Sequence, residues 1–83
     1  MRQHQTKIID SIDYEREDNI NAVQTWFGDR NGVDFLYDPD SNEYFVLTRV
    51  GMEMCRRGDT IAKDSDGWFR VLKPFHDRKS TAQ

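Results

Sequence analysis

The chain has 83 residues and a net charge of −3, with 33% charged residues and 36% apolar ones. This length is near the lower limit at which one hydrophobic core holds without disulfides or metal ions, so it excludes a second domain. Ten aromatic residues are enough to seal one compact core despite the polar composition.

The cellular compartment is indicated by cysteine usage and by the apolar runs. Cys55 is the only cysteine, whereas a small secreted domain would carry several in disulfides, so we expect a reducing compartment. Residues 1–5 are polar and form no signal-peptide core, and no apolar run approaches the roughly 20 residues that a membrane span needs. The sequence therefore predicts a soluble, cytoplasmic protein.

Charge is distributed unevenly along the chain. Residues 1–43 hold ten acids and four bases, whereas residues 44–83 hold five acids and eight bases. The first half is thus acidic and the second mildly basic. Such asymmetry can steer a partner of opposite charge, and ordinary solvated surfaces explain it equally well.

The first half of the chain predicts one strand and one helix. Residues 6–14 place Ile8, Ile12 and Tyr14 on one side of an extended strand. Asp18 stands where a helix N-cap belongs, and Gly28 suits the left-handed residue that follows a helix. Apolar residues between them are spaced as on one helix face, which predicts a helix over about 19–27. So short a helix must pack on a sheet to be stable.

The second half predicts five short strands joined by tight turns. β-branched and aromatic residues mark the ranges 33–37, 44–48, 52–55, 60–63 and 68–72. Strand 44–48 is apolar on both faces, which indicates a central position. The turns contain Pro39, Gly51, Gly58 and Gly67, and Pro74 ends the last strand.

The expected fold is therefore α+β. It comprises one strand, one short helix and then a meander of about five short antiparallel strands packed on the helix. Residues 1–75 are expected to form this single domain, and residues 76–83 are expected to form a flexible tail because they are polar.

Catalysis and metal binding are not expected. Asp38, Asp40 and Asn42 have the spacing that opens a calcium loop, but Glu43 stands where such a loop needs glycine. The two histidines and Cys55 are isolated, which predicts no zinc site and a buried, inert thiol. No glycine-rich loop is placed to hold a phosphate. We therefore expect no catalytic residue, no metal ligand and no cofactor.

Several short motifs together carry a resemblance. They are Lys7-Ile8-Ile9, Asp18-Asn19-Ile20, Phe27-Gly28, the hairpin of residues 46–52, Arg57-Gly58-Asp59-Thr60-Ile61, Asp66-Gly67 and Lys73-Pro74. Over about residues 7–75 this pattern resembles a family of small phage and prophage proteins of unassigned biochemistry. That family has Pro-Gly-Asp-Trp-Ile in the turn, so Arg57 and Thr60 are departures, and its Asp-Ile-Phe ending is absent here. The resemblance implies a phage origin and a fold, and it brings no catalytic residue.

Elimination leaves binding as the expected function. The leading hypothesis is a phage protein that inhibits or modulates a host protein or protein–nucleic-acid complex, such as a defence nuclease, a CRISPR complex or a polymerase. It would act by steric and electrostatic blocking in the host cytoplasm. The acidic half supplies the candidate contact residues, which are Glu15, Glu17, Asp18, Asp29, Asp34, Asp38 and Asp40. Edge strands also make pairing into a homodimer feasible.

Two alternative functions stay open. A protein that sequesters a nucleotide signal would stack the ligand on Trp68 and Tyr44 and neutralise it with arginines. A nucleic-acid-binding accessory domain would combine charge and stacking, although the overall acidity argues against it. The candidate residues of this alternative face are Arg56, Arg57, Trp68 and Arg70.

Overall fold

The computed structural model describes residues 6–74. In chain order the elements are β1 (Ile8–Asp13), the 3₁₀ turn η1 (Glu17–Asn19), α1 (Ile20–Phe27), the 3₁₀ turn η2 (Gly28–Arg30), β2 (Phe35–Asp38), β3 (Glu43–Thr48), β4 (Gly51–Cys55), β5 (Thr60–Asp64) and β6 (Phe69–Leu72). No helix within this range is long and apolar enough to cross a membrane. The expected flexible tail over 76–83 lies outside the described residues.

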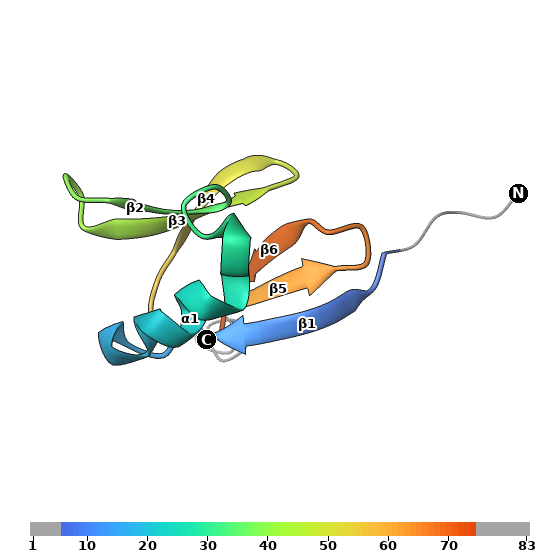
Figure 1. Ribbon diagram of the computed structural model, residues 1–83, viewed down its shortest axis with the longest axis horizontal. Coiled ribbons are helices and arrows are strands. Elements are labelled where there is room, and N and C mark those ends of the chain that lie inside the picture. Colours follow the sequence, from blue (N-terminus) through green and yellow to red (C-terminus); the bar gives the residue numbers. More distant parts are fainter. Residues whose placement is uncertain (1–5, 75–83) are drawn as a thin grey trace, which may run out of the picture.

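The six strands form one mostly antiparallel sheet that folds into two layers (Figure 1). β2, β3 and β4 make one layer, in which β3 pairs with both neighbours. β1, β5 and β6 make the other layer, with β5 in its middle. The layers join where β3 and β6 pair in parallel through a single bridge, Thr48 with Phe69. Helix α1 lies at one side of the space between the layers (Figure 1).

The structure confirms the expected helix and a mostly antiparallel sheet, but not the continuous meander. After β4 the chain does not turn back beside it, because the turn of residues 56–59 carries it to the other layer. Gly58, at φ +98°, donates its N–H to the carbonyl of Tyr14 over 2.7 Å, and the Tyr14 N–H donates to the Asp59 carbonyl over 2.9 Å. These bonds place β5 beside β1. Local sequence signals identify a turn, but they do not show which strand will pair with the strand that comes after it.

The helix begins differently from the expectation. Asp18 is not its N-cap, because the chain first makes the 3₁₀ turn η1, and the α1 N-cap is Asn19. The Asn19 side chain accepts the N–H groups of Glu15 and Arg16 and donates to the Asp13 carbonyl over 2.9 Å. Asn19 thus ties the helix start to the end of β1. The helix ends before Gly28, whose positive φ of 63° agrees with the expectation.

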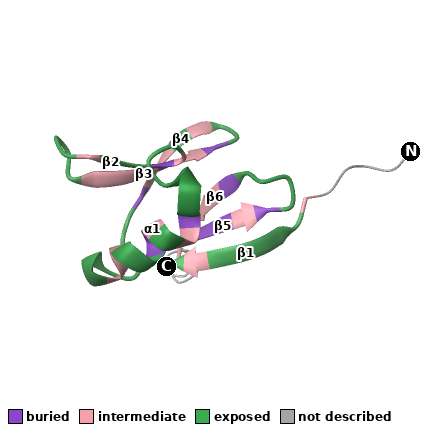
Figure 2. Ribbon diagram, viewed as in Figure 1, coloured by how far each residue is buried: buried purple, intermediate pink, exposed green. Residues whose placement is uncertain are grey.

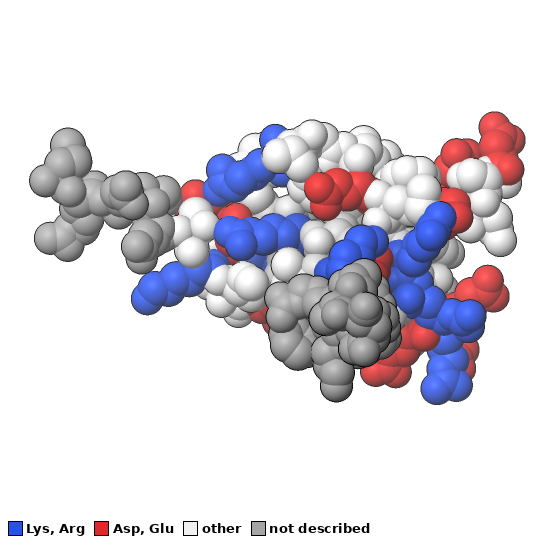
Figure 3. Space-filling model, turned by 180° about the vertical axis from the view of Figure 1, so that it is seen from behind, with Lys and Arg blue, Asp and Glu red and all other residues white. Residues whose placement is uncertain are grey.

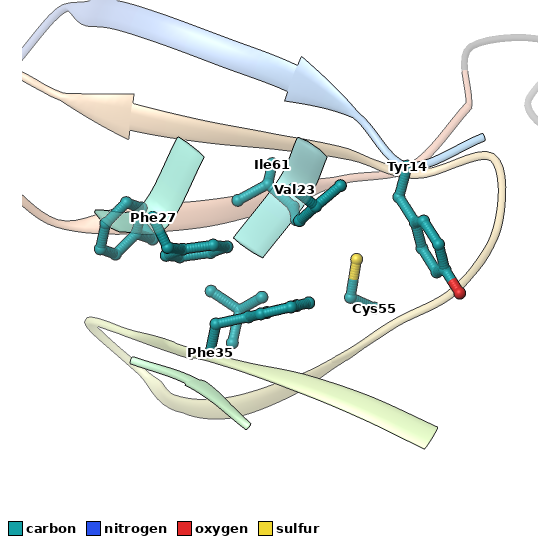
Figure 4. Packing of buried hydrophobic residues seen from close by; sticks show 8 residues of the cluster. Tyr14, Val23, Phe27, Phe35, Cys55 and Ile61 are labelled. Carbon is teal, nitrogen blue, oxygen red and sulfur yellow. The ribbon is translucent and has the colours of Figure 1, made fainter. Parts of the chain in front are cut away.

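The core lies between the two layers and the helix (Figure 4). Its centre is a group of aromatic rings: Phe27 stacks on Phe35 and also contacts Phe69, each at a centroid distance of 4.6 Å. Val23, Val46 and Ile61 are fully buried beside them. Buried positions therefore concentrate on the inward sides of the strands and on one side of α1 (Figure 2).

Strand 44–48 has the predicted central position, since β3 pairs with three strands. Strand 33–37 begins later than expected, because Val33 lies outside β2 in a turn and is 50% exposed. The turns at residues 38–42 and 64–67 are as predicted. Their aspartates hold them, since Asp38 accepts the Asp40 N–H and Asp64 accepts the Asp66 N–H.

Candidate binding surfaces

The predicted acidic residues divide into two groups, and most of them gather at one end of the molecule. Glu15, Glu17 and Asp18 are exposed in and beside η1, just before α1. Asp38 and Asp40 lie in the turn between β2 and β3. Figure 1 shows the start of α1 and this turn at the same end of the molecule, and Figure 3 shows acidic and basic side chains side by side at that end from behind. We call these five residues the acidic end.

Three tyrosines connect the two parts of the acidic end. Tyr14 precedes Glu15 and meets Tyr44 edge-on at 5.9 Å, and Tyr44 meets Tyr37, which precedes Asp38, at 4.9 Å. Tyr14 is buried, whereas Tyr37 is 48% exposed. The Tyr37 hydroxyl donates to the Asn42 side chain. The row of rings therefore gives the acidic end an aromatic centre that is partly open to solvent.

The electrostatics of these tyrosines show how near the carboxylates lie. Burial raises the pKa of Tyr14, and the charges at Tyr44 and Glu17 raise it further. Burial also raises the pKa of Tyr44, with further increases from Tyr37 and Glu17. Glu17, in η1, is therefore an electrostatic neighbour of Tyr14, which follows β1, and of Tyr44 in β3, while the charge of Arg57 opposes the effect at Tyr14.

Basic residues border the acidic end without neutralising it. Arg16 lies 3.6 Å from the carboxylate of Asp18, and Arg56 lies 3.8 Å from that of Glu43. Both pairs are exposed, and exposed pairs contribute little to stability. A strongly charged partner can therefore exchange with either arginine at small cost.

The remaining two predicted acids lie elsewhere. Asp29 is exposed in η2, and Asp34 forms an ion pair of 2.9 Å with Arg30. The hydrogen bond to Asp34 raises the pKa of Arg30, and the charge of Asp34 adds to the effect. The structure thus brings together five of the seven predicted acidic residues and separates these two.

The alternative face is divided by the structure. Arg56 lies near Glu43, at the start of β3, whereas Trp68 and Arg70 lie near its other end. A strand of this length separates the two groups by about 17–20 Å. Trp68 carries the guanidinium of Arg49 over its ring at 5.4 Å, an arginine that sequence reasoning did not include. Arg56, Arg57, Trp68 and Arg70 therefore do not form one binding face.

A groove of about 310 Å³ lies between the β3–β4 turn and β6, whereas Trp68 lines a separate pocket. Arg49 and Arg70 line the groove together with Glu53. The buried Asp64 lies near both arginines: its Oδ2 is 3.6 Å from the Nη2 of each, an ion pair in which Oδ2 accepts no hydrogen bond. Arg49 also pairs with Asp66 at 2.8 Å. Because carboxylates offset these arginines, the groove has no excess of positive charge.

Asp64 organises this region from inside. Its side chain is fully buried, and Oδ1 accepts the N–H groups of Asp66 and Trp68. Burial pushes the pKa of Asp64 upward, but the two backbone hydrogen bonds and the charges of Arg49 and Arg70 outweigh it and lower the pKa overall. Sequence reasoning identified Asp64 only as a turn residue, since nothing local shows that the arginines meet there.

The chemistry of the buried thiol is unfavourable for nucleophilic attack. Cys55 is 1% exposed, as predicted. Burial raises the pKa of its thiol to about 12, and the charge of Asp59 contributes to the increase. At neutral pH the sulfur therefore stays protonated. No group of three or more His, Cys, Asp or Glu side chains within residues 6–74 is placed to hold a metal ion.

The sequence analysis missed an apolar surface on the layer of β2, β3 and β4. Cross-strand pairs place Leu36, Phe45 and Met54 in one row and Leu47 and Met52 in the next. Phe35, Val46 and Cys55 point the opposite way, into the core. We call these five outward side chains the outer face. None of the five belongs to the buried cluster or to the partly buried hydrophobic residues packed against it.

The outer face differs sharply from the matching side of the other layer. There the outward residues of β1, β5 and β6 include Asp13, Thr60 and Arg70, and the Thr60 hydroxyl donates to Asp13 over 2.6 Å. On the outer face Leu36 is 37% exposed and Met52 46%, whereas Phe45, Leu47 and Met54 are half-buried. An apolar surface of this kind on a polar protein is a candidate interaction site. The sequence signal for this surface was the apolar residues at the outward positions of strand 44–48. They were interpreted as evidence that the strand is buried on both faces.

Comparisons with protein-family models, with curated proteins and with solved structures found no match to this chain.

Proposed function

We propose that this chain is a small binding protein that uses its acidic end to cover a basic surface of a host protein or protein–nucleic-acid complex. One observation carries the proposal: two carboxylate groups that are distant in the sequence lie at one end of the molecule, joined by a row of tyrosines. Carboxylates attract Lys and Arg, and a half-exposed tyrosine such as Tyr37 offers them a ring face. Tyrosine is also enriched at protein interfaces.

The mode of action that fits this surface is blocking. A bound acidic end would occupy positive charge that the partner uses for nucleic acid, so the inhibition would be steric and electrostatic. The resemblance to small phage and prophage proteins supports a host partner, such as a defence nuclease, a CRISPR complex or a polymerase. An exposed charged contact of this kind weakens as the salt concentration rises.

The test is a triple charge reversal, Glu15→Lys with Glu17→Lys and Asp18→Lys. Tagged wild-type and variant proteins are used to capture partners from host lysate, which are identified by mass spectrometry. We expect a specific partner with the wild type and at least a tenfold loss with the variant, because the attraction becomes repulsion.

The matched control reverses three acids away from the acidic end, Asp10→Lys with Asp29→Lys and Glu53→Lys. This control changes the net charge of the protein by the same amount as the first variant. It therefore distinguishes an effect of the acidic end on capture from an effect of the overall charge. Capture that survives the first triple variant, or that falls equally with the control, contradicts the proposal.

A second candidate function rests on the groove lined by Arg49 and Arg70. Its volume of about 310 Å³ is at the lower end of the range for small-molecule sites, and Arg49 and Arg70 can contact an anionic ligand there. A sequestered nucleotide signal would raise the melting temperature of the protein. A panel of cyclic nucleotides in a thermal-shift assay tests this, and no shift across the panel removes this candidate.

A further inference from the structure

The outer face is an interaction surface without an assigned partner. Its centre consists of Leu36, Phe45, Leu47, Met52 and Met54, with no charged side chain among them. Interface centres are depleted of charge in this way, and methionines adapt their shape to apolar partners. The two rows leave one side of β3 apolar, although the chain as a whole is polar.

The charges beside the outer face indicate the charge of its partner. The next cross-strand row contains Asp38 and Glu43, with Arg56 lying 3.8 Å from Glu43. At the other end of the rows, Leu47 shares a pocket with Arg30, Asp34 and Asp66. At the first end Asp38 and Glu43 outnumber Arg56, whose Nε also donates to the sulfur of Met54 over 3.1 Å. At the second end Arg30 pairs with Asp34 and Arg49 with Asp66, so the charges balance. The complementary partner therefore presents apolar side chains with Lys or Arg at the end beside Asp38 and Glu43.

The dimensions favour a single helix over a second copy of the chain. Strands of five to six residues are about 17–20 Å long, and three neighbouring strands are about 10 Å across between the outer two. The area is roughly 170–200 Å², far short of the ~800 Å² per partner of a standard interface. An α-helix is about 10 Å wide and covers this length with about 12 residues. An extended peptide would instead add to a sheet edge.

We propose that the outer face binds a basic amphipathic helix of the partner protein. The helix would lie along β3 with its apolar side on the two rows and its Lys or Arg residues beside Asp38 and Glu43. Asp38 belongs to the acidic end and to the row beside the outer face, so the two surfaces meet at this residue. The inference thus rests on the proposed function, since it names the part of the partner that this chain recognises.

The test uses a designed peptide of about 14 residues, with Leu on one helix face and Lys on the other sides. A permuted peptide of identical composition, in which the leucines share no face, is the peptide control. Binding is measured by fluorescence polarisation at low salt. We expect the amphipathic peptide to bind at least tenfold more tightly than the permuted one. Equal binding of the two peptides, or no binding of either, overturns the inference.

Two variants place a charge on the outer face, Leu36→Glu and Met52→Glu. Each is expected to weaken peptide binding at least tenfold, although each adds negative charge that favours a basic peptide electrostatically. The matched controls are Ile9→Glu and Val50→Glu, at apolar positions that are 61% and 82% exposed and lie off the outer face. Unchanged binding by Leu36→Glu and Met52→Glu overturns the inference. Far-UV circular dichroism verifies that all four variants fold.

The triple reversal of Glu15, Glu17 and Asp18 separates this inference from the proposed function. If only this variant loses the peptide, the acidic end alone is the contact and the outer-face inference fails. If host capture survives it while Leu36→Glu abolishes peptide binding, the acidic-end proposal fails and the outer face stands. A wild-type dimer that Met52→Glu dissociates, measured by light scattering, would assign the face to a second copy and overturn the inference.

Discussion

At the scale of single residues, Asp64 shows how a buried charge is made tolerable. Its carboxylate is fully buried, yet Oδ1 accepts two backbone N–H groups and Oδ2 faces Arg49 and Arg70. Removing one partner of a buried charge pair leaves the other charge buried and uncompensated. Asp64 therefore holds the β5–β6 turn, Trp68 and the edge of the groove in one arrangement.

The pH dependence of stability follows from this environment. The folded protein lowers the pKa of Asp64 below its unfolded value, so its contribution is present above the unfolded pKa. It is lost as the pH falls below about 4, through the folded pKa. We expect Asp64→Asn to be destabilised at neutral pH and the difference from wild type to narrow in this acid range. Urea unfolding at a series of pH values measures both.

Arg49→Gln provides the companion variant. It keeps the carboxylate and its backbone hydrogen bonds but removes one of the two charges that lower the pKa. Its loss of stability in acid should therefore be smaller than in wild type and should be complete at a higher pH, because the folded pKa lies closer to the unfolded one. A constant free-energy difference between Asp64→Asn and wild type from neutral to acid pH would show that Asp64 does not titrate as inferred.

At the scale of elements, the turn between β4 and β5 determines the topology. Asp59 is 3% exposed, accepts the Arg56 N–H over 2.8 Å and pairs with Lys73 at 2.9 Å. Gly58 has the positive φ that lets the chain reverse beside Tyr14. This small set of contacts decides that β5 joins β1 and not β4.

Replacement of Gly58 tests the importance of that backbone conformation. A Cβ at this position would meet Pro74 at an ordinary 3.5 Å, so the cost comes from φ +98° and not from a clash. Gly58→Ala is expected to lower the free energy of unfolding by about 1–2 kcal/mol. Gly58→Asn should cost less, because asparagine adopts positive φ more readily. Chemical denaturation compares the two, and equal stability of Gly58→Ala and wild type would contradict this account.

The elements themselves were largely predictable from the sequence. Alternating residues identified every strand, and glycines identified the turns, because both depend on local conformational preferences. Strand pairing was not predictable, since the contact between Tyr14 and Asp59 spans most of the chain. The sequence predicted Asp18 as the N-cap of the helix, whereas the N-cap is Asn19. In the sequence, both residues suit this position equally well. The additional 3₁₀ turn that separates them has no clear sequence signature.

At the scale of the whole molecule, Phe27 joins all three parts of the fold. It comes from α1, stacks on Phe35 of β2 in one layer and contacts Phe69 of β6 in the other. The layers themselves pair only through Thr48 and Phe69. Side-chain packing, more than backbone pairing, therefore makes the two layers one cooperative unit.

Truncation of Phe27 tests this cooperativity. Phe27→Ala is expected to cost about 3–5 kcal/mol, a large part of the stability of a small domain. Ile9→Ala, at an exposed position, should change stability by less than about 0.5 kcal/mol. Wild-type unfolding followed by circular dichroism and by tryptophan fluorescence should give coincident transitions. Separate transitions for the two probes, or a small effect of Phe27→Ala, would show that the layers are independent.

The candidate surfaces were predictable only in part. Charge counting identified the acidic half, and the structure gathers Glu15, Glu17, Asp18, Asp38 and Asp40 at one end. It could not identify the tyrosine row between them, because Tyr14, Tyr37 and Tyr44 come from separate segments. The outer face was missed for another reason: an apolar strand face looks the same in sequence whether another layer of the fold or a partner covers it.

The outer face has a consequence for how this protein can diversify. Its five side chains project away from the core, so a change at Leu36 or Met52 would alter the proposed docking surface without removing a contact from the buried cluster. The residues that hold the fold and those proposed to bind a partner thus lie on opposite sides of the same strands. Substitutions on the outer side could therefore change the proposed specificity while the inner side keeps the chain folded.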